Sequence, residues 1–312
     1  MDLKPIIKAN KPNISSSSID TYLSNIRSTG RQTNLTFNSI KDITDNAKTI
    51  LESMKDLKTH TRKTKLASFV VALDGKDQSK TVKDTLALFR EKMNIDLDTI
   101  KEKDTNQELT DTQKNNFVPW NDVLKLFKEI EIEAQPLLKL KSLTYKNLQK
   151  LTDYILLGLY TQIPPRRALD YTAFKIRNID EATDNFLKIK KHSYKLVFNR
   201  YKNSARLGPQ VIDLPSSFGK VLKKFADKNP YDHLIVNKLG KPVLQSHVTK
   251  ILNRLFDKHT SVSLLRHSFL TEKFGNVNLK DLEQVTHDIG NKEIARSLKY
   301  VSAAHAGGDS ST

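Results

Sequence analysis

The sequence contains no cysteine and no long apolar segment. Disulfide bonds, thiolate metal sites and cysteine nucleophiles are therefore excluded. The first thirteen residues have no apolar run long enough for a signal peptide. The longest apolar stretches, such as residues 67–73 and 154–160, are far too short to span a bilayer. We therefore expect an intracellular protein that does not enter membranes, in whichever compartment holds its partner.

Several catalytic motifs are also missing. The sequence contains no P-loop of the form Gly-x-x-x-x-Gly-Lys-Ser/Thr. It has no His-Glu-x-x-His motif and no carboxylate cluster with the spacing of a two-metal site. These absences argue against a metal-dependent nuclease or transposase, and we expect neither a metal nor an organic cofactor.

Positive charge is the most pronounced feature of the composition. Lys and Arg total 52 against 35 for Asp and Glu, which gives a net charge of +17. A basic excess of this size is typical of a surface that binds phosphates, since each neutralised phosphate releases counterions. The apolar content of 38% is sufficient for ordinary globular cores, and 312 residues favour two domains. A nucleic acid is therefore the expected partner, although a generally basic soluble protein would have the same composition.

The first part of the chain reads as helical. Residues 1–14 resemble a flexible basic arm, and Ser16 to Ser18 offer N-caps for a helix through Ile26. Further helical patterns cover residues 40–57, 65–73, 81–93 and a segment beginning near Trp120. No strand signal is evident before residue 140. We predict a helical domain over residues 15–138.

The second part has mixed character. A helix over residues 146–161 ends at Pro164-Pro165, which cannot continue it. Residues 186–189, 195–199 and 211–214 read as short strands, and helices are expected at 216–226, 246–256, 264–274 and 291–300. The tail, residues 302–312, is small and polar, and we expect it to be disordered. The predicted fold is mainly α with a small antiparallel sheet (α+β), and its second domain covers residues 139–301.

Two segments of the second half are TQIPPRRALDYTAFKIRNID, residues 161–180, and SVSLLRHSFLT, residues 261–271. They resemble the two arginine boxes of tyrosine recombinases, the integrase class of enzymes. The first segment places the arginine of the family on Arg167, with Asp170 at the usual acidic position. The second segment contains Arg266. The motifs PPRR and YKNS look most like those of integrases of large DNA viruses and other mobile elements.

Other parts of the second half fit the same family in order. Residues 195–215 resemble the hairpin that carries its catalytic lysine, here Lys202, and residues 236–256 fit the stretch before the second box. His287 and Tyr300 follow in the expected order. The resemblance covers about residues 140–301. Residues 15–130 agree more loosely, as the helical core-binding domain that clamps the other side of the duplex.

The resemblance implies a role for each residue. Arg167 and Arg266 would hold the non-bridging oxygens of the scissile phosphate through bidentate hydrogen bonds. Lys202 would protonate the leaving 5′ oxygen, and His287 would donate a hydrogen bond to the phosphate. Tyr300 would attack phosphorus and form a 3′-phosphotyrosyl ester, so that rejoining needs no ATP.

Each of these residues also has an ordinary structural interpretation. Arginine after two prolines and lysine in a basic hairpin are usually solvated, and a lone histidine is more often a cap or a core residue. Arg266 is different, because a charge in an apolar helix needs a partner or a ligand. Of nine tyrosines, only Tyr300 lies beyond Arg266, where the family has its nucleophile. Order and spacing together favour the catalytic interpretation.

Three departures from the family pattern stand out. Ser263 occupies the position of the usual histidine three residues before Arg266, which removes the common proton acceptor for Tyr300. His267 and His259 are near in sequence but out of register. The interval from His287 to Tyr300 is longer than usual by about one helical turn. Only residues 301–312 follow Tyr300, where many members carry a helix that docks on a neighbouring protomer.

Three activities remain open at the level of the sequence. The first is site-specific recombination of double-stranded DNA, with paired strand exchange by a homotetramer. A type IB topoisomerase uses the same chemistry. A recombinase relic that binds DNA without cutting is the third, and Ser263 gives it some support.

Overall fold

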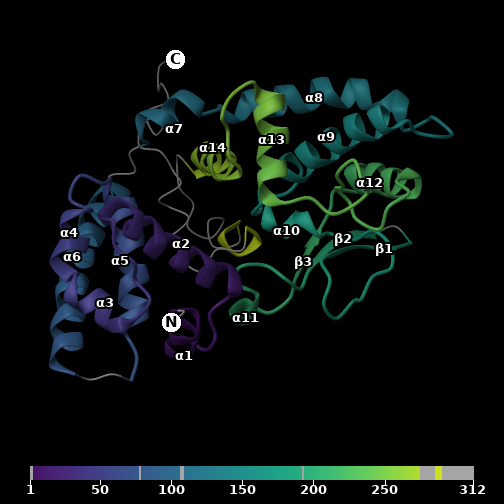
Figure 1. Cartoon of the computed structure of the whole chain (residues 1–312). Coiled ribbons are helices and arrows are strands. Elements are labelled where there is room, and N and C mark those ends of the chain that lie inside the picture. Colours follow the sequence, from purple (N-terminus) through teal and green to yellow (C-terminus); the bar gives the residue numbers. More distant parts are fainter. Residues whose placement is uncertain (1–2, 77–78, 106–108, 192, 275–284, 290–312) are drawn as a thin grey trace, which may run out of the picture. The chain divides into compact units, whose positions relative to one another are not determined.

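The computed structural model describes residues 3–76, 79–105, 109–191, 193–274 and 285–289. The chain divides into two compact units, residues 1–106 and residues 107–312 (Figure 1). Each unit has its own buried apolar core.

The described part of the first unit is entirely helical. Its helices are α1 (Leu3–Asn10), α2 (Ser16–Thr33), α3 (Ile40–Asp45), α4 (Ala47–Glu52), α5 (Thr59–Leu73) and α6 (Lys80–Thr105). In α2 the Ser15 side chain caps the start by accepting from the Ser18 amide, and Ile19, Leu23 and Ile26 are buried at helical spacing. Asn34 ends the helix in the left-handed conformation. The sequence therefore predicts this helix well, with the cap one residue earlier than expected.

The expected amino-terminal arm differs from the structure. Residues 3–10 form α1 instead of a flexible segment, and Leu3 and Ile7 are buried in the core of the first unit. Asn10 donates from Nδ2 to the carbonyls of Val71 and Ala72 at the end of α5, at 3.0 and 2.9 Å. The apolar residues at positions i and i+4 give this segment an amphipathic face, and that face is what docks it.

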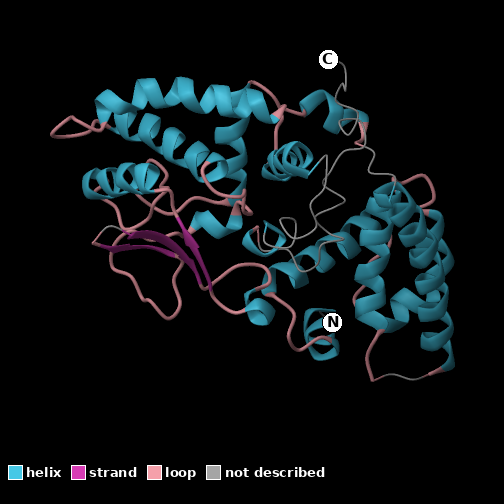
Figure 2. Cartoon of the chain, turned by 180° about the vertical axis from the view of Figure 1, so that it is seen from behind, coloured by secondary structure: helices cyan, strands magenta, loops and turns pink. Residues whose placement is uncertain are grey.

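The described part of the second unit combines helices with one sheet. Its helices are α7 (Asp111–Asn116), α8 (Trp120–Leu137), α9 (Tyr145–Thr161), α10 (Leu169–Thr172), α11 (Ser204–Leu207), α12 (Ser216–Lys228), α13 (Gln245–Phe256) and α14 (Val262–Phe274). Its strands are β1 (Phe186–Lys190), β2 (Ser193–Phe198) and β3 (Gln210–Asp213). The strands form an antiparallel sheet in the order β1-β2-β3 (Figure 2, magenta), with Leu187 opposite Leu196 and Leu196 opposite Ile212.

Helix α9 is the centre of the second unit. Every residue from Asp153 to Tyr160 is buried, as expected for a helix enclosed on all sides. Gly158 allows close packing of α12, because a Cβ at this position would lie 2.3 Å from the Phe218 ring. The aromatic rings of Tyr160, Tyr171 and Phe198 extend this core toward the sheet.

The boundary between the units lies earlier than the predicted one at residue 138. Helix α8 packs along α9 inside the second unit, as Figure 1 shows. Val123 and Phe127 of α8 are buried in the core of that unit, and the Phe127 ring stacks on Tyr154 at 5.4 Å. The apolar face of α8 packs against α9, so α8 belongs to the second unit. Its sequence pattern nevertheless resembles that of the helices of the first unit.

The predicted fold class, mainly α with a small antiparallel sheet, is confirmed. All three strands lie where the alternation of apolar residues places them. The expected helix over residues 40–57 is interrupted at Asn46, which separates α3 from α4. The helix expected at 291–300 and the tail at 302–312 lie outside the described residues. None of the described helices combines the length and the apolar content of a membrane span.

Candidate functional site

The first arginine box forms a short turn between α9 and α10. Helix α9 ends at Thr161, and Pro164-Pro165 prevent it from continuing. The next two residues have different environments: Arg166 is 0% exposed, whereas Arg167 is half-buried. The main-chain carbonyl of Arg167 accepts from the amide of Asp170 at 3.0 Å and starts α10. The turn therefore encloses one arginine and leaves its neighbour in contact with solvent.

Asp170 is the buried partner of Arg166. Its Oδ2 accepts from Arg166 Nε at 2.9 Å, and both side chains are fully buried. Burial raises the pKa of this carboxyl, while Arg166, Arg167 and Arg266 oppose that rise. The two arginines predicted from separate sequence boxes therefore lie close enough to one carboxyl group to affect its ionisation.

Arg266 is placed by α14. It is 3% exposed, with buried Leu264 and Leu265 beside it. Burial raises the pKa of the Tyr160 hydroxyl, and the charge of Arg266 opposes that shift. The Trp120 ring meets Phe269 edge-on at 5.2 Å and holds α14 against α8. Arg266 is thus an enclosed cation on a well-packed helix, as its apolar neighbours in the sequence predict.

Lys202 lies in the connection between β2 and β3, as predicted. It is exposed, while Tyr201 before it is buried and donates from its hydroxyl to the carbonyl of Gly208 at 2.7 Å. Gln210, the first residue of β3, is buried at the other end of the connection. The lysine therefore projects from a loop whose two ends are anchored in the core.

His287 lies on a helical turn at residues 285–288. Val285 and Ile289 of this segment are buried against Leu270 and Phe274 of α14. The His287 side chain is 58% exposed, and its Nδ1 lies 3.4 Å from Asp288 Oδ1. Its carbonyl accepts from Gln210 Nε2 at 2.9 Å. The segment at residues 285–289 therefore packs against α14, the helix of Arg266, and is hydrogen-bonded to β3 through Gln210.

The supporting residues lie as follows. Ser263 is exposed in the first turn of α14, one turn before Arg266, and His267 is half-buried on the same helix. The predicted nucleophile, Tyr300, lies outside the described residues. In the described part of the chain, the charges of Arg167 and Arg266 both oppose the rise in the pKa of Asp170, and Gln210 links the segments of Lys202 and His287.

Two residues of this arrangement were missed at the level of the sequence, Arg166 and Gln210. Arg166 Nη1 donates to Gln210 Oε1 at 2.8 Å and also to the carbonyl of Asp288. The signal for Arg166 was present: an acidic residue four positions later can pair with it once a helical turn forms. Gln210 lies two positions before Ile212, so the alternation places both on one face of β3, but the sequence does not indicate which polar group Gln210 would contact.

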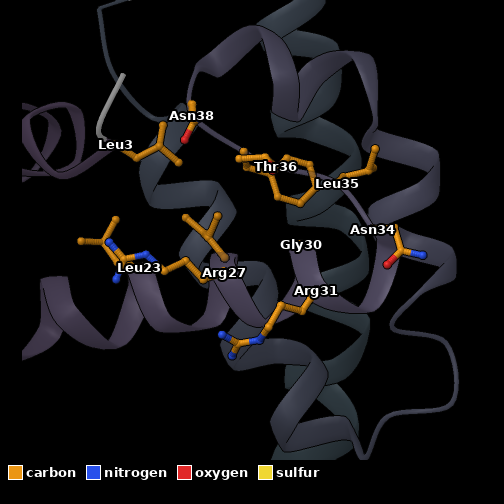
Figure 3. A pocket seen from close by; sticks show the side chains of 11 residues that line it. Leu3, Leu23, Arg27, Gly30, Arg31, Asn34, Leu35, Thr36 and Asn38 are labelled. Atoms are coloured by element: carbon orange, nitrogen blue, oxygen red, sulfur yellow. The ribbon is translucent and has the colours of Figure 1, made fainter.

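Two further properties of the described residues concern metal binding and a hollow in the first unit. The described residues contain no group of three His, Asp or Glu side chains able to hold a metal ion. A hollow of about 730 Å³ lies in the first unit, between α2 and the loop at residues 34–38 (Figure 3). The exposed side chains of Arg27 and Arg31, one helical turn apart on α2, line it. None of the predicted catalytic residues that the structure describes lines it.

Comparison with solved structures identifies the fold. A crystal structure of lambda integrase, residues 75–356, as a dimer bound to a COC′ core site, matches with a TM-score of 0.53. The match covers 99% of this chain and 96% of that one, at 12% sequence identity. No protein-family profile and no curated protein sequence matches the chain. The chain therefore has the fold of lambda integrase, a tyrosine recombinase.

Proposed function

We propose that this protein is a site-specific DNA recombinase that cleaves and rejoins DNA through a 3′-phosphotyrosyl intermediate. One observation carries the proposal: hydrogen bonds of buried Arg166 and Gln210 join the turn that carries Arg167 to Asp170 and to the segment of His287. This network lies in a chain with the fold of lambda integrase over nearly its full length. The charges of Arg167 and Arg266 both oppose the rise in the pKa of Asp170, which supports a site with enough positive charge for a phosphodiester.

The arginines would supply the charge that the reaction needs. Transfer of a phosphodiester passes through a state with added negative charge on the non-bridging oxygens. Guanidinium groups stabilise that charge by paired hydrogen bonds, fixed in place before the reaction. Arg167, which is half-buried, has access to solvent and to a DNA phosphate; Arg266 supports the same centre from inside. The proposed chemistry therefore needs no metal ion.

Lys202, His287 and Tyr300 would complete the reaction. Exposed Lys202 protonates the leaving 5′ oxygen, and His287 donates to the phosphate from a side chain that is 58% exposed. Tyr300 attacks phosphorus. A phenol has a pKa near 10, so it must be held in line and lose its proton as it attacks. Ser263 cannot act as the usual histidine base, so we expect slow cleavage, with a water, a phosphate oxygen or His267 as acceptor.

Double-stranded DNA is the proposed partner, and both units would contact it. The charge of +17 supports this, because it provides many cations for phosphates. Strand exchange between two duplexes would require four protomers. The PPRR and YKNS spellings favour an integrase of a virus or another mobile element.

A second candidate is a relic that binds DNA without cutting. The exposed Ser263, where the family has histidine, favours it. A covalent protein–DNA adduct separates the two candidates, once the recognition sequence has been selected from random DNA. Adduct formation in EDTA supports the recombinase, and binding without an adduct supports the relic. Relaxation of supercoiled plasmid without sequence preference would instead indicate a type IB topoisomerase.

A further inference from the structure

Arg166 makes more contacts than its ion pair with Asp170 requires. Its Nε donates to Asp170 at 2.9 Å and its Nη1 to Gln210 at 2.8 Å. Nη1 also donates to the carbonyl of Asp288. These partners lie on α10, on β3 and on the turn at residues 285–288. One buried cation therefore connects three segments, the last of them 122 positions later in the chain.

Gln210 extends these contacts to His287. Its Oε1 accepts from Arg166, and its Nε2 donates to the carbonyl of His287 at 2.9 Å. The side chain is only 3% exposed, so water does not compete with these hydrogen bonds. We call Arg166 and Gln210, with the hydrogen bond between them, the Arg166–Gln210 bridge. It fixes the main chain of the segment that carries His287.

The bridge also holds the loop of Lys202. The Arg166 guanidinium carbon lies 4.0 Å from the centre of the Phe198 ring and 5.0 Å from that of Tyr201. Phe198 ends β2, and Tyr201 immediately precedes Lys202. Gln210 begins β3 at the other end of the same loop. Both ends of the Lys202 loop therefore contact one guanidinium.

We propose that Arg166 is a positioning residue, which holds the Lys202 loop and the His287 segment in register with Arg167. This inference rests on the proposed function of the site. A buried ion pair adds little net stability compared with apolar residues of similar size, so stability alone does not explain it. The planar fork of an arginine, in contrast, contacts several partners with fixed geometry. Because Arg166 is 0% exposed and its hydrogen bonds are to groups of the protein, we assign it no contact with the phosphate or the leaving group.

Cleavage by the Arg166→Met variant tests the proposal. Single-turnover cleavage of a nicked recognition duplex should fall by about a hundredfold, because small displacements of catalytic groups cost that much. In a duplex with a 5′-bridging sulfur, the leaving group is a thiolate, which departs without protonation. This duplex should restore part of the rate, because part of the defect is a misplaced Lys202. Loss of stability alone would lower both rates equally.

Arg177→Met is the matched control. Arg177 also joins main-chain carbonyls in the second unit, those of Ala226, Asn229 and Tyr231, but it contacts none of the predicted site residues in the described structure. This variant should lose stability and retain the cleavage rate. Arg166→Lys keeps the charge without the fork, so its rate should remain well below that of the wild type.

Gln210→Glu tests the bridge if Arg166→Met does not fold. Glutamate still accepts from Arg166 but cannot donate to the carbonyl of His287. Amide hydrogen exchange in the protein without DNA gives a readout separate from activity: residues 285–289 should exchange faster in Gln210→Glu, and not in Arg177→Met. Unchanged exchange there, or wild-type cleavage by Arg166→Met on both substrates, would overturn the positioning role. A wild type that forms no adduct, with faster exchange in Gln210→Glu, would refute the proposed function and leave the bridge intact.

Discussion

The Nε of Arg166 donates to Oδ2 of Asp170 at 2.9 Å, and neither side chain is exposed to solvent. Arg167, the next residue, is half-buried and acts on the same carboxyl. Adjacent arginines thus have separate tasks in the proposed site. Arg166 is enclosed and joins segments of the chain, and half-buried Arg167 is the one proposed to hold the phosphate.

This separation predicts the behaviour of Arg167→Ala. The variant should fold, because it leaves the Arg166–Asp170 pair in place. Its cleavage rate should fall by roughly 10²–10³, the usual cost of one lost donor to a developing oxyanion. A 5′-bridging sulfur should not restore the rate, since the lost group does not protonate the leaving oxygen. Single-turnover kinetics on both substrates decide this, and rescue by sulfur would contradict the assignment.

Helices and strands that depend on a local pattern of apolar residues could be predicted from the sequence. The alternation of residues 195–199 and the spacing of Ile19, Leu23 and Ile26 led to a strand and a helix that are present. The convergence of Arg167 with Arg266 was expected only from the family resemblance and stays a prediction, supported by the effect of both charges on the pKa of Asp170.

What could not be predicted depends on packing between distant segments. Gln210 lies on the buried face of β3 together with Ile212, so the alternation of the strand accounts for its burial. Its hydrogen bond to Arg166, 44 positions earlier, depends on the tertiary fold and could not be predicted. Helix α8 has an ordinary amphipathic pattern, and this pattern does not indicate in which unit its apolar face is buried. Residues 3–10 are too short to signal a stable helix alone, because α1 depends on the core that buries Ile7.

Lys202→Ala should slow cleavage by roughly two to four orders of magnitude, the range for a lost general acid. The exposed side chain makes no contribution to the core, so thermal stability should stay close to that of the wild type. A 5′-bridging sulfur should restore the rate, because a thiolate leaves without a proton. Absence of rescue would mean that Lys202 only contacts DNA.

Ile7→Ala should destabilise the first unit by about 2–5 kcal/mol, because the side chain is fully buried and its removal leaves a cavity. Urea unfolding followed by circular dichroism measures this. Lys8→Ala is a control on the same helix, since its side chain is exposed. Equal stability of both variants would show that α1 does not belong to the core in solution.

Arg27 and Arg31 should contribute to DNA affinity through phosphates. They are exposed on successive turns of α2, beside the hollow of the first unit. Replacing both with alanine should weaken binding and reduce the slope of log affinity against log salt by about two, roughly one for each lost phosphate contact. Titrations of labelled duplex at several salt concentrations measure the slope. An unchanged slope would place the DNA on another face of this unit.

The central claim is that Tyr300 forms a covalent bond to DNA, and one measurement tests it most directly. On a nicked suicide substrate the cut fragment diffuses away, so the phosphotyrosyl ester accumulates even when cleavage is slow. Mass spectrometry of the digested adduct, formed in EDTA, should find the 3′ phosphate of the DNA on the peptide that contains Tyr300. Tyr300→Phe should bind the same duplex and form no adduct. An adduct on any other residue, or an active Tyr300→Phe variant, would contradict the account.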